Sequence, residues 1–335
     1  MNRTSPQTRV VIAGTARHAE LYASAFQALP GAAIEAVWCP TDASEEELLA
    51  AEGLARSMQA SIITDFSFAG DLVVSCVGPH RQSALVEPVL ASGCALWLDQ
   101  PLASSPEDLE SMLLAIARYP EAKVGVASRR FSPATSEVRQ VIESGALGVP
   151  FALHVTLVAH SATDARLEGS LDPAFMGGEV VRLGPIVAGT VIEILGQDVS
   201  AIEGYRSQLF YDPHRQAGVE DSAAVSISFA DGASATLIMG RATLGNPGHG
   251  VLEEVRVRGT RGAINASSAR THARVGSGGE LGIVEAAAAE FIASLTDARK
   301  RKRDLETAVS AQRLAWDIRD SLIGVEEVES RYKRD

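Results

Sequence analysis

Short apolar runs rich in β-branched residues alternate with stretches of helical spacing through the first 120 residues, and this alternation constrains the fold most. The expected strands are Arg9–Ala13, Ala33–Cys39, Asp71–Val77 and Ala95–Leu98, and the expected helices are Ala19–Leu29, Ser44–Gln59 and Gln82–Ser92. Strands that alternate with helices form right-handed βαβ units around a parallel sheet. Asp71–Val77 is apolar throughout, as in a strand covered on both faces. We therefore expect an α/β Rossmann-type domain over residues 1–125.

The pattern changes after about residue 150, where strand signals follow one another with few helices between them. The expected strands are Phe151–Ala159, Ala223–Phe229, Ala233–Met239 and Glu253–Gly259, and the expected closing helices are Ile283–Leu295 and Asp304–Ile323. The Asp231–Gly232 pair between two of these strands is a strong hairpin signal. Residues 126–335 are thus predicted to form an α+β domain with a mostly antiparallel open sheet. We expect its outer face to be apolar and covered by a partner chain.

Charge and composition exclude several classes of partner. The formal net charge is -12, which disfavours nucleic acid and membrane surfaces because these bind clustered Lys and Arg. The one basic run, Arg299–Arg303, is predicted to be a solvated loop between the closing helices. Cys39, Cys76 and Cys94 lack metal-ligand spacing and are interpreted as buried thiols in a reducing compartment, with no metal site. The N-terminus shows no signal peptide and the chain no membrane-spanning run, so we expect a cytoplasmic protein.

The turn from the first strand to the first helix reads GTARHA, a shortened form of the dinucleotide fingerprint. In such folds this turn holds a pyrophosphate on the helix N-terminus. Alanines stand where the second and third glycines of G-x-G-x-x-G would be, so a tight turn without a ligand is the alternative. The predicted cofactor-binding residues of this loop are Gly14, Thr15, Ala16, Arg17 and His18.

The second strand ends in Cys39-Pro40-Thr41-Asp42, without an acidic residue at the usual ribose-binding position. Asp42 comes two or three residues late, so it either contacts the ribose or caps the helix that follows. No arginine comes closely after it to hold a 2′-phosphate. The sequence therefore leaves open whether the cofactor is NAD or NADP.

Four longer passages together resemble the glucose–fructose oxidoreductase/inositol dehydrogenase family, known as Gfo/Idh/MocA. Residues 75–105 (SCVGPHRQSALVEPVLASGCALWLDQPLASS) are similar to that family's strand–Thr-Pro-Asn–helix–strand–Glu-Lys-Pro passage. Residues 128–150 (SRRFSPATSEVRQVIESGALGVP) resemble its linker into the second domain. Residues 220–237 (EDSAAVSISFADGASATL) and 255–264 (VRVRGTRGAI) resemble two segments of its second sheet.

This resemblance implies a nicotinamide cofactor, a small-molecule substrate and a homo-oligomer, either a dimer or a tetramer, formed through the second sheet. The cofactor would lie at the carboxyl ends of the parallel strands. Besides the glycine loop and Asp42, the expected cofactor-binding residues are Val77, Gly78, Pro79, His80, Asp99 and Gln100.

The residues that carry the chemistry in the family are all replaced in this chain. The family's Glu-Lys-Pro falls on Asp99-Gln100-Pro101, so glutamine replaces the catalytic lysine. Its Asp and His, from a G-G-x-x-x-D-x-G-x-H segment, fall on Arg182 and Ile186. Glutamine cannot release a proton near neutral pH, isoleucine has no polar group, and arginine stays charged. The resemblance therefore implies no proton relay at the usual place.

Two functions are consistent with this replacement. The first is an oxidoreductase that reduces an imine or polarised double bond, with Gln100 and Arg182 as catalytic residues and Arg130, His160 and Arg182 binding the substrate. The second is a redox-silent family member that acts as a ligand sensor or partner subunit. Each candidate also has a structural interpretation: an interdomain or sheet-edge contact for Arg130, an ion pair with Glu179 for Arg182, and a structural role for His160 and His80.

Overall fold

The computed structural model describes residues 8–15, 18–65, 70–160, 171, 177–208, 211–242, 251–268 and 280–324. The chain divides into two compact units, which we describe separately. The first comprises residues 1–128 and 279–306, and the second comprises residues 129–278 and 307–335. The sequence-based division placed all of residues 126–335 in the second domain, whereas residues 279–306 here group with the first unit. The physical reason is packing: helix α10 (Glu280–Ser294) lies against α1 (Ala19–Ala28).

The sheet of the first unit is parallel, with strand order β3-β2-β1-β4-β5-β6. Its strands are β1 (Thr8–Ala13), β2 (Ala32–Trp38), β3 (Ser61–Ile63), β4 (Leu72–Ser75), β5 (Ala95–Leu98) and β6 (Val124–Val126). The connecting helices, besides α1, are α2 (Glu45–Met58), α3 (Pro79–Ala91) and α4 (Pro106–Ala117). The Rossmann-type fold predicted from the sequence is confirmed.

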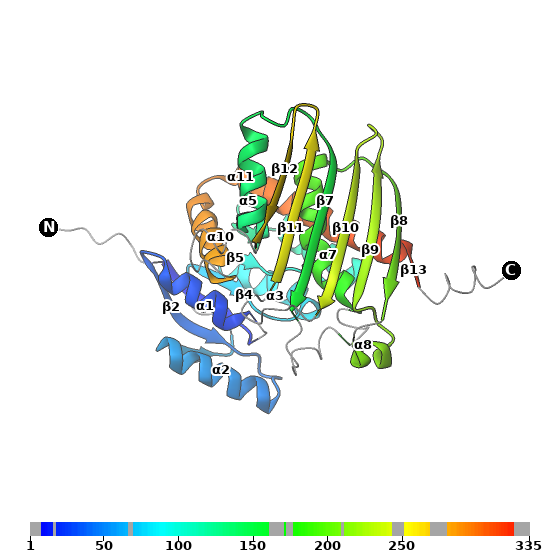
Figure 1. The fold of residues 1–335 in the computed structure, drawn as a ribbon. Coiled ribbons are helices and arrows are strands. Elements are labelled where there is room, and N and C mark those ends of the chain that lie inside the picture. Colours follow the sequence, from blue (N-terminus) through cyan, green and yellow to red (C-terminus); the bar gives the residue numbers. More distant parts are fainter. Residues whose placement is uncertain are drawn as a thin grey trace. The chain divides into compact units, whose positions relative to one another are not determined.

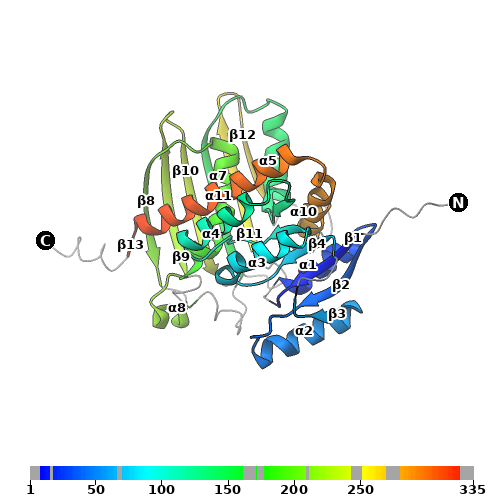
Figure 2. The same cartoon turned by 180° about the vertical axis from the view of Figure 1, so that it is seen from behind.

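Local sequence explains where these elements begin. Strands β4 and β5 consist entirely of buried residues, as their apolar sequences predict. Ser44 caps α2 and forms a capping box with Glu47, while α3 starts at Pro79. The chain winds outward from β1 in both directions. Right-handed crossovers therefore place α1 and α2 on one face of the sheet and α3 and α4 on the other (Figure 2).

The second unit contains a mixed, mostly antiparallel sheet with the order β12-β11-β7-β10-β9-β8-β13 (Figure 1). Its strands are β7 (Pro150–His160), β8 (Val199–Ser207), β9 (Ser222–Phe229), β10 (Ser234–Ala242), β11 (Val251–Gly259), β12 (Ala263–Ser267) and β13 (Leu322–Gly324). Pairs β7/β10 and β8/β13 are parallel, and the others are antiparallel. Asp231 and Gly232 form the β9–β10 hairpin as predicted, because Gly232 adopts φ +88°.

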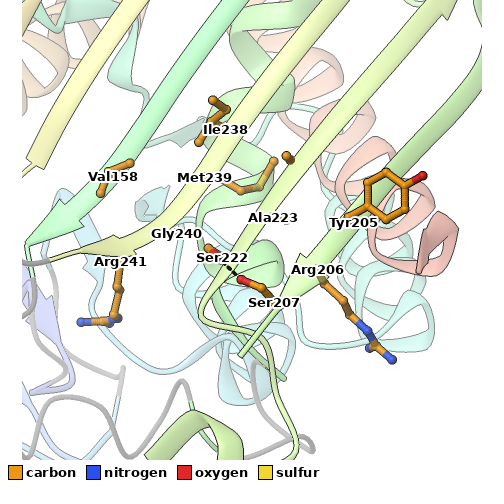
Figure 3. A pocket seen from close by; sticks show the side chains of 11 residues that line it. Val158, Tyr205, Arg206, Ser207, Ser222, Ala223, Ile238, Met239, Gly240 and Arg241 are labelled. Atoms are coloured by element: carbon orange, nitrogen blue, oxygen red, sulfur yellow. Dashed lines mark hydrogen bonds between the residues drawn. The ribbon is translucent and has the colours of Figure 1, made fainter. Parts of the chain in front are cut away.

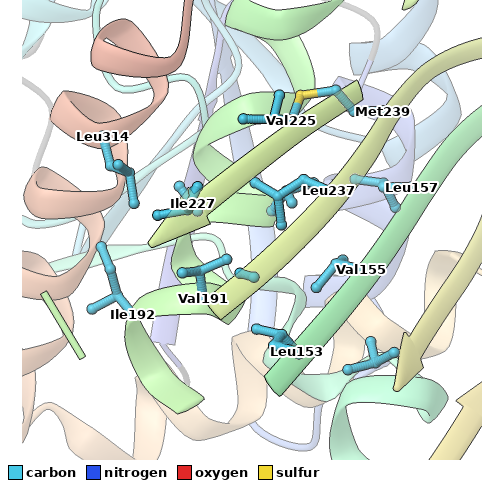
Figure 4. Packing of buried hydrophobic residues seen from close by; sticks show 14 of the residues in the cluster. Leu153, Val155, Leu157, Val191, Ile192, Val225, Ile227, Leu237, Met239 and Leu314 are labelled. Atoms are coloured by element: carbon cyan, nitrogen blue, oxygen red, sulfur yellow. The ribbon is translucent and has the colours of Figure 1, made fainter. Parts of the chain in front are cut away.

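Three helices of this unit, α5 (Pro133–Glu143), α7 (Glu179–Leu195) and the later part of α11 (Ala298–Ser321), pack on one face of its sheet and build the core there. The unit also contains the short turn η1 (Arg129–Phe131) and helix α8 (Asp212–Ala217). Leu157 and Leu237 of the sheet, Val191 of α7 and Leu314 of α11 belong to one buried cluster (Figure 4). Alternate residues of β9 and β10 contribute to it, which is the period-2 pattern of a half-covered sheet.

Three expectations need correction. The basic run Arg299–Arg303 lies within helix α11 rather than in a loop, because Asp297 accepts hydrogen bonds from the backbone N–H of Lys300 (to Oδ1) and of Arg301 (to O) and so starts the helix. Strand β8 was not predicted, since its polar residues hide the alternation. The outer face of the second sheet is mixed rather than apolar: exposed Tyr205 and Ile238 stand among exposed Ser and Thr residues of β9 and β10.

Candidate functional site

The turn after β1 fits only glycine at its first position. Gly14 has φ +97°, and a Cβ there would lie 2.8 Å from both Cys76 O and Val77 Cγ1. Its N–H donates to Trp38 O at 2.9 Å, which ties the turn to the end of β2. The absent side chain lets the start of this loop approach the end of β4 closely. The predicted residues Ala16 and Arg17 lie outside the described residues.

Strand order brings the predicted cofactor-binding turns to one edge of the first sheet. The Val77–His80 turn follows β4, and Asp99 follows β5, while β1 neighbours β4 on its other side. Gly78 is the N-cap of α3, and a Cβ there would meet the ring of His80 at 2.8 Å. The predicted residues of this edge therefore share the carboxyl ends of neighbouring strands, the place where open α/β sheets bind ligands.

Asp99 lies at the centre of a hydrogen-bond cluster that joins α1 to the turn carrying Gln100. Its Oδ1 accepts from Tyr22 Oη at 2.5 Å and from Gln100 N at 2.8 Å. Its Oδ2 lies 3.2 Å from His18 Nδ1. Both carboxylate oxygens are thus engaged, and the side chain is 17% exposed. Asp99 therefore holds its neighbours in place, and its predicted contact with the cofactor stays a prediction.

Aromatic rings packed around Trp97 hold Tyr22, one member of this cluster, in place. The Tyr22 ring stacks on Trp97 with centroids 5.4 Å apart, and Phe26 meets Trp97 edge-on at 4.7 Å. Phe291 of α10 stacks on the indole at 6.3 Å. This packing fixes the Tyr22 ring, and therefore the hydroxyl that Asp99 accepts from.

Gln82 is a buried amide that holds the backbone around Gln100. Its Nε2 donates to the carbonyl oxygens of Asp99, Pro101 and Leu102 at 3.1, 3.2 and 2.8 Å. Its Oε1 accepts from Asp99 N at 3.0 Å and from Ser75 Oγ at 2.7 Å. Gln82 is 0% exposed, so these contacts replace all its hydration. The sequence analysis missed this role of Gln82, because the only local signal for it is its position in the first turns of α3.

The end of β2 differs from the expectation for Asp42. Asp42 is exposed and does not cap α2, because Ser44 accepts the backbone N–H of Glu47. Its proposed contact with a ribose stays a prediction.

All three cysteines are free and buried, and burial raises the pKa of the Cys76 thiol well above its usual value. The Cys76 thiol is therefore a poor nucleophile.

The start of α7 in the second unit is an ion-pair cluster around Glu179, a residue that is fully buried. Arg182 donates to its Oε2 through Nε at 2.7 Å and also through Nη2, while Arg241 Nε donates to Oε1 at 2.5 Å. His214 Nε2 lies 3.5 Å from the same Oε1. Burial pushes the pKa of Glu179 upward, but Arg182, His214 and Arg241 outweigh burial and hold it at about 2.

Backbone geometry explains how Glu179 reaches this position. Gly178 has φ +115°, and a Cβ there would overlap with the carboxylate of Glu220. Glu220 Oε1 in turn accepts the N–H of Val180 at 2.9 Å, at the first turn of α7. Burial raises the pKa of Glu220. The sequence did not reveal Glu220, His214 or Arg241, because each lies at least 35 residues from Glu179 along the chain.

The other predicted residues have these surroundings. The Arg182 side chain is 15% exposed and makes the ion pair with Glu179 that was the structural alternative. Ile186 packs against the core of the second unit. The Arg130 guanidinium lies 5.1 Å from the centre of the Phe131 ring, and neighbouring Arg129 pairs with Glu253 at 3.5 Å. The side chain of His160 lies outside the described residues.

A hollow of about 350 Å³ lies along strands β7, β8, β9 and β10 of the second sheet, and Arg241, which pairs with Glu179, is one of the residues that line it (Figure 3). Val158, Tyr205 and Ile238 are among the side chains that line it, and Ser207 Oγ and Ser222 Oγ share a hydrogen bond of 2.6 Å at its edge.

Within the described ranges no three His, Cys, Asp or Glu side chains gather as a metal site. In the same part of the chain, no helix is long and apolar enough to cross a membrane.

Comparison with known proteins agrees with this fold over most of the chain. Residues 8–127 match the model of an oxidoreductase family with an NAD-binding Rossmann fold, and residues 135–265 match the GFO/IDH/MocA C-terminal domain. This chain therefore belongs to the Gfo/Idh/MocA oxidoreductase family. The cofactor of its first unit is accordingly NAD or NADP.

Individual relatives are distant. The uncharacterized oxidoreductase YrbE of Bacillus subtilis is 21% identical over 205 residues, which span 60% of this chain and 56% of that protein. A putative myo-inositol dehydrogenase from Sinorhizobium meliloti has a TM-score of 0.78 at 21% identity, covering 94% of this chain and 97% of that one. Scyllo-inositol dehydrogenase from Lactobacillus casei, solved with NAD(H) and scyllo-inositol, has a TM-score of 0.77 at 16% identity over 94% and 97% of the chains. These structures share the fold.

Proposed function

We propose that this chain is a nicotinamide-dependent oxidoreductase that reduces a small molecule containing an imine or a polarised double bond. The observation that carries the proposal is the turn that contains Gln100: Asp99 accepts the backbone N–H of Gln100, and Gln82 holds the backbone on either side of it. These contacts would serve to position a substrate or the nicotinamide amide. A reduced dinucleotide, when bound, would supply the hydride, and a polarised double bond would take its proton from solvent water. A protonated imine already carries the proton that an alcohol oxidation would require the protein to remove.

The roles of the side chains follow from their chemistry. Gln100 orients the nicotinamide amide or a substrate oxygen by hydrogen bonding, since it cannot transfer a proton. Arg182 binds a substrate carboxylate, with Arg130 and His160 as further substrate-binding residues. Two guanidinium groups, those of Arg182 and Arg241, share the carboxylate of Glu179, which supports a net attraction for an anionic substrate group. Catalysis then depends on positioning and electrostatics.

The test is a steady-state survey with purified protein. We expect NADH or NADPH consumption with a cyclic imine that bears a carboxylate and no reduction of dinucleotide by a polyol such as myo-inositol. Arg182→Ala should weaken the binding of the acidic imine by about 2–5 kcal/mol and leave the binding of its neutral ester unchanged. The ester serves as the control, because a folding defect would affect both substrates equally. Turnover of polyols alone would contradict the proposal.

A redox-silent ligand sensor is the second candidate, favoured by the engagement of Arg182 with Glu179 and the packing of Ile186 into the core. Energy transfer from tryptophan to bound NADH separates the two functions. Binding of NADH with no turnover of any imine or ketone would support the sensor. Loss of binding in Gly14→Asp, whose side chain has no room beside Cys76, is the specificity control.

We also propose that the protein acts in the cytoplasm as a homo-oligomer, with the outer face of the second sheet as the contact. Exposed Tyr205 and Ile238 support this assembly. Light scattering should give a dimer or tetramer, and Ile238→Asp should shift it toward monomer. A monomer at all concentrations would contradict it.

A further inference from the structure

Arg81 and Glu47 form an ion pair although they are 34 residues apart in the sequence. Arg81 Nη1 lies 3.2 Å from Glu47 Oε1, and the two side chains are 37% and 40% exposed. Arg81 belongs to the first turn of α3 and Glu47 to the first turn of α2. The fold thus brings a guanidinium group to the start of α2, where the local sequence has no arginine.

The ion pair lies beside the end of β2. Cys39 directly follows that strand, and burial raises the pKa of its thiol, Glu47 raises it further and Arg81 lowers it. Both charges therefore act on the carboxyl end of β2. In a Rossmann fold this end meets the adenine ribose, which carries a 2′-hydroxyl in NAD and a 2′-phosphate in NADP. The charges at this position decide between the two cofactors.

Both carboxylate oxygens of Glu47 are held in place. Its Oε2 accepts the backbone N–H of Ser44 at 2.9 Å, and its Oε1 accepts from Arg81. The Glu47 N–H donates to Ser44 Oγ at 3.2 Å, so the cap uses part of the anion-binding capacity of the α2 N-terminus. The exposed neighbours Asp42, Glu45 and Glu46 add further negative charge.

From these contacts we infer that Glu47 makes this protein select NAD over NADP. Glu47 engages the guanidinium group of Arg81 and neutralises its charge, so that this cation is not free to bind a 2′-phosphate at the end of β2. A phosphate monoester carries a charge of about −1.5 to −2 at neutral pH and would be left without a counter-charge there. The inference rests on the proposed function as a nicotinamide-dependent enzyme and narrows its cofactor to NAD.

The experiment measures the Kd of NADH and of NADPH for the full chain by energy transfer from tryptophan. For the wild type we expect NADPH to bind at least about tenfold more weakly than NADH. Glu47→Gln keeps the capping box, because glutamine serves at that position, and frees Arg81. It should strengthen NADPH binding about tenfold and change NADH binding less than about twofold.

Two further variants make the result specific. Glu46→Gln removes one exposed charge from the same helical turn and should change the NADPH Kd by less than about twofold. Glu47→Gln combined with Arg81→Ala should lose the gain in NADPH affinity. Equal Kd values for the two dinucleotides in the wild type, or equal effects of Glu46→Gln and Glu47→Gln, would overturn the inference. Failure of folded wild type to bind either dinucleotide would instead contradict the proposed function itself.

Discussion

Asp99 in the first unit and Glu179 in the second are both carboxylates surrounded by donors, but the donors differ in charge. Asp99 accepts from a tyrosine hydroxyl and a backbone amide and contacts one histidine, and it keeps some exposure. Glu179 is fully buried and contacts two arginines and a histidine. The first cluster holds the turn that carries Gln100 in place through hydrogen bonds. In the second, each buried charge is compensated by the others.

This difference has an energetic consequence. Hydrogen bonds from neutral donors to a carboxylate contribute about 1.5–3 kcal/mol each when buried and less at a partly exposed site such as Asp99, so single changes around Asp99 should be tolerated. Removing one member of a buried ion cluster leaves uncompensated charge and costs about 3–5 kcal/mol. Substitution of polar residues around Glu179 in the second unit should therefore lower the free energy of unfolding more than substitution around Asp99 in the first. Changes around Asp99 should instead show mainly in the affinity for the cofactor.

The largest effect is expected for Glu179→Gln. The guanidinium groups of Arg182 and Arg241 would lose their shared counter-charge inside the second unit, at a cost of about 3–5 kcal/mol in the free energy of unfolding. Urea unfolding followed by circular dichroism measures it. Glu193→Gln, at an exposed position on the same helix, is the matched control and should cost less than about 0.5 kcal/mol. Equal effects of the two changes would show that the cluster is not a charge-dependent unit.

The same cluster predicts a dependence on acid pH. The pKa of Glu179 is held at about 2, below the ordinary 4.5, so its ionised form stabilises the folded state. That contribution is complete above the unfolded pKa and is lost as the pH falls from about 4.5 to about 2. The free energy of unfolding of the wild type should fall more steeply over this range than that of Glu179→Gln. Parallel curves for the two proteins would contradict this assignment.

Gln82→Leu should have the next largest effect. The change leaves Asp99 N–H, Ser75 Oγ and three backbone carbonyls without their partner in a buried place, at a cost of about 2–4 kcal/mol. Because the turn carries Gln100, NADH binding should weaken as well. Gln27→Leu, at an exposed position of α1, is the control for stability and binding. Normal NADH affinity in a folded Gln82→Leu protein would remove Gln82 from the positioning role.

The sequence predicted the architecture well because that architecture depends on local patterns. Buried runs such as Leu72–Ser75 and the hairpin at Asp231–Gly232 are visible without knowledge of distant residues. Polar strand β8 was missed, since its pairing with β9 and not its composition makes it a strand. The basic run was misjudged because a single cap at Asp297 decides whether it is helical.

The site was less predictable, since its contacts join residues that are far apart in the chain. The resemblance located Asp99, Gln100 and Arg182, and an ion pair with Glu179 was the structural alternative for Arg182. Nothing local connects Gln82 to the Gln100 turn, Arg241 to Glu179 or Arg81 to the end of β2. Only the order of strands and helices in space makes these pairs, so sequence patterns within one element cannot reveal them.

The smallest effect is expected for Tyr22→Phe, and it tests the comparison most finely. The change removes the hydroxyl that donates to Asp99 Oδ1 at 2.5 Å and keeps the ring that stacks on Trp97. Because the lost contact is one hydrogen bond to a partly exposed carboxylate, stability should fall by about 1 kcal/mol and NADH affinity by less than about fivefold. Thermal unfolding and tryptophan energy transfer measure the two quantities, with Tyr119→Phe after α4 as the control. A loss as large as that of Glu179→Gln would mean that Asp99, like Glu179, belongs to a cluster that fails when one member is removed.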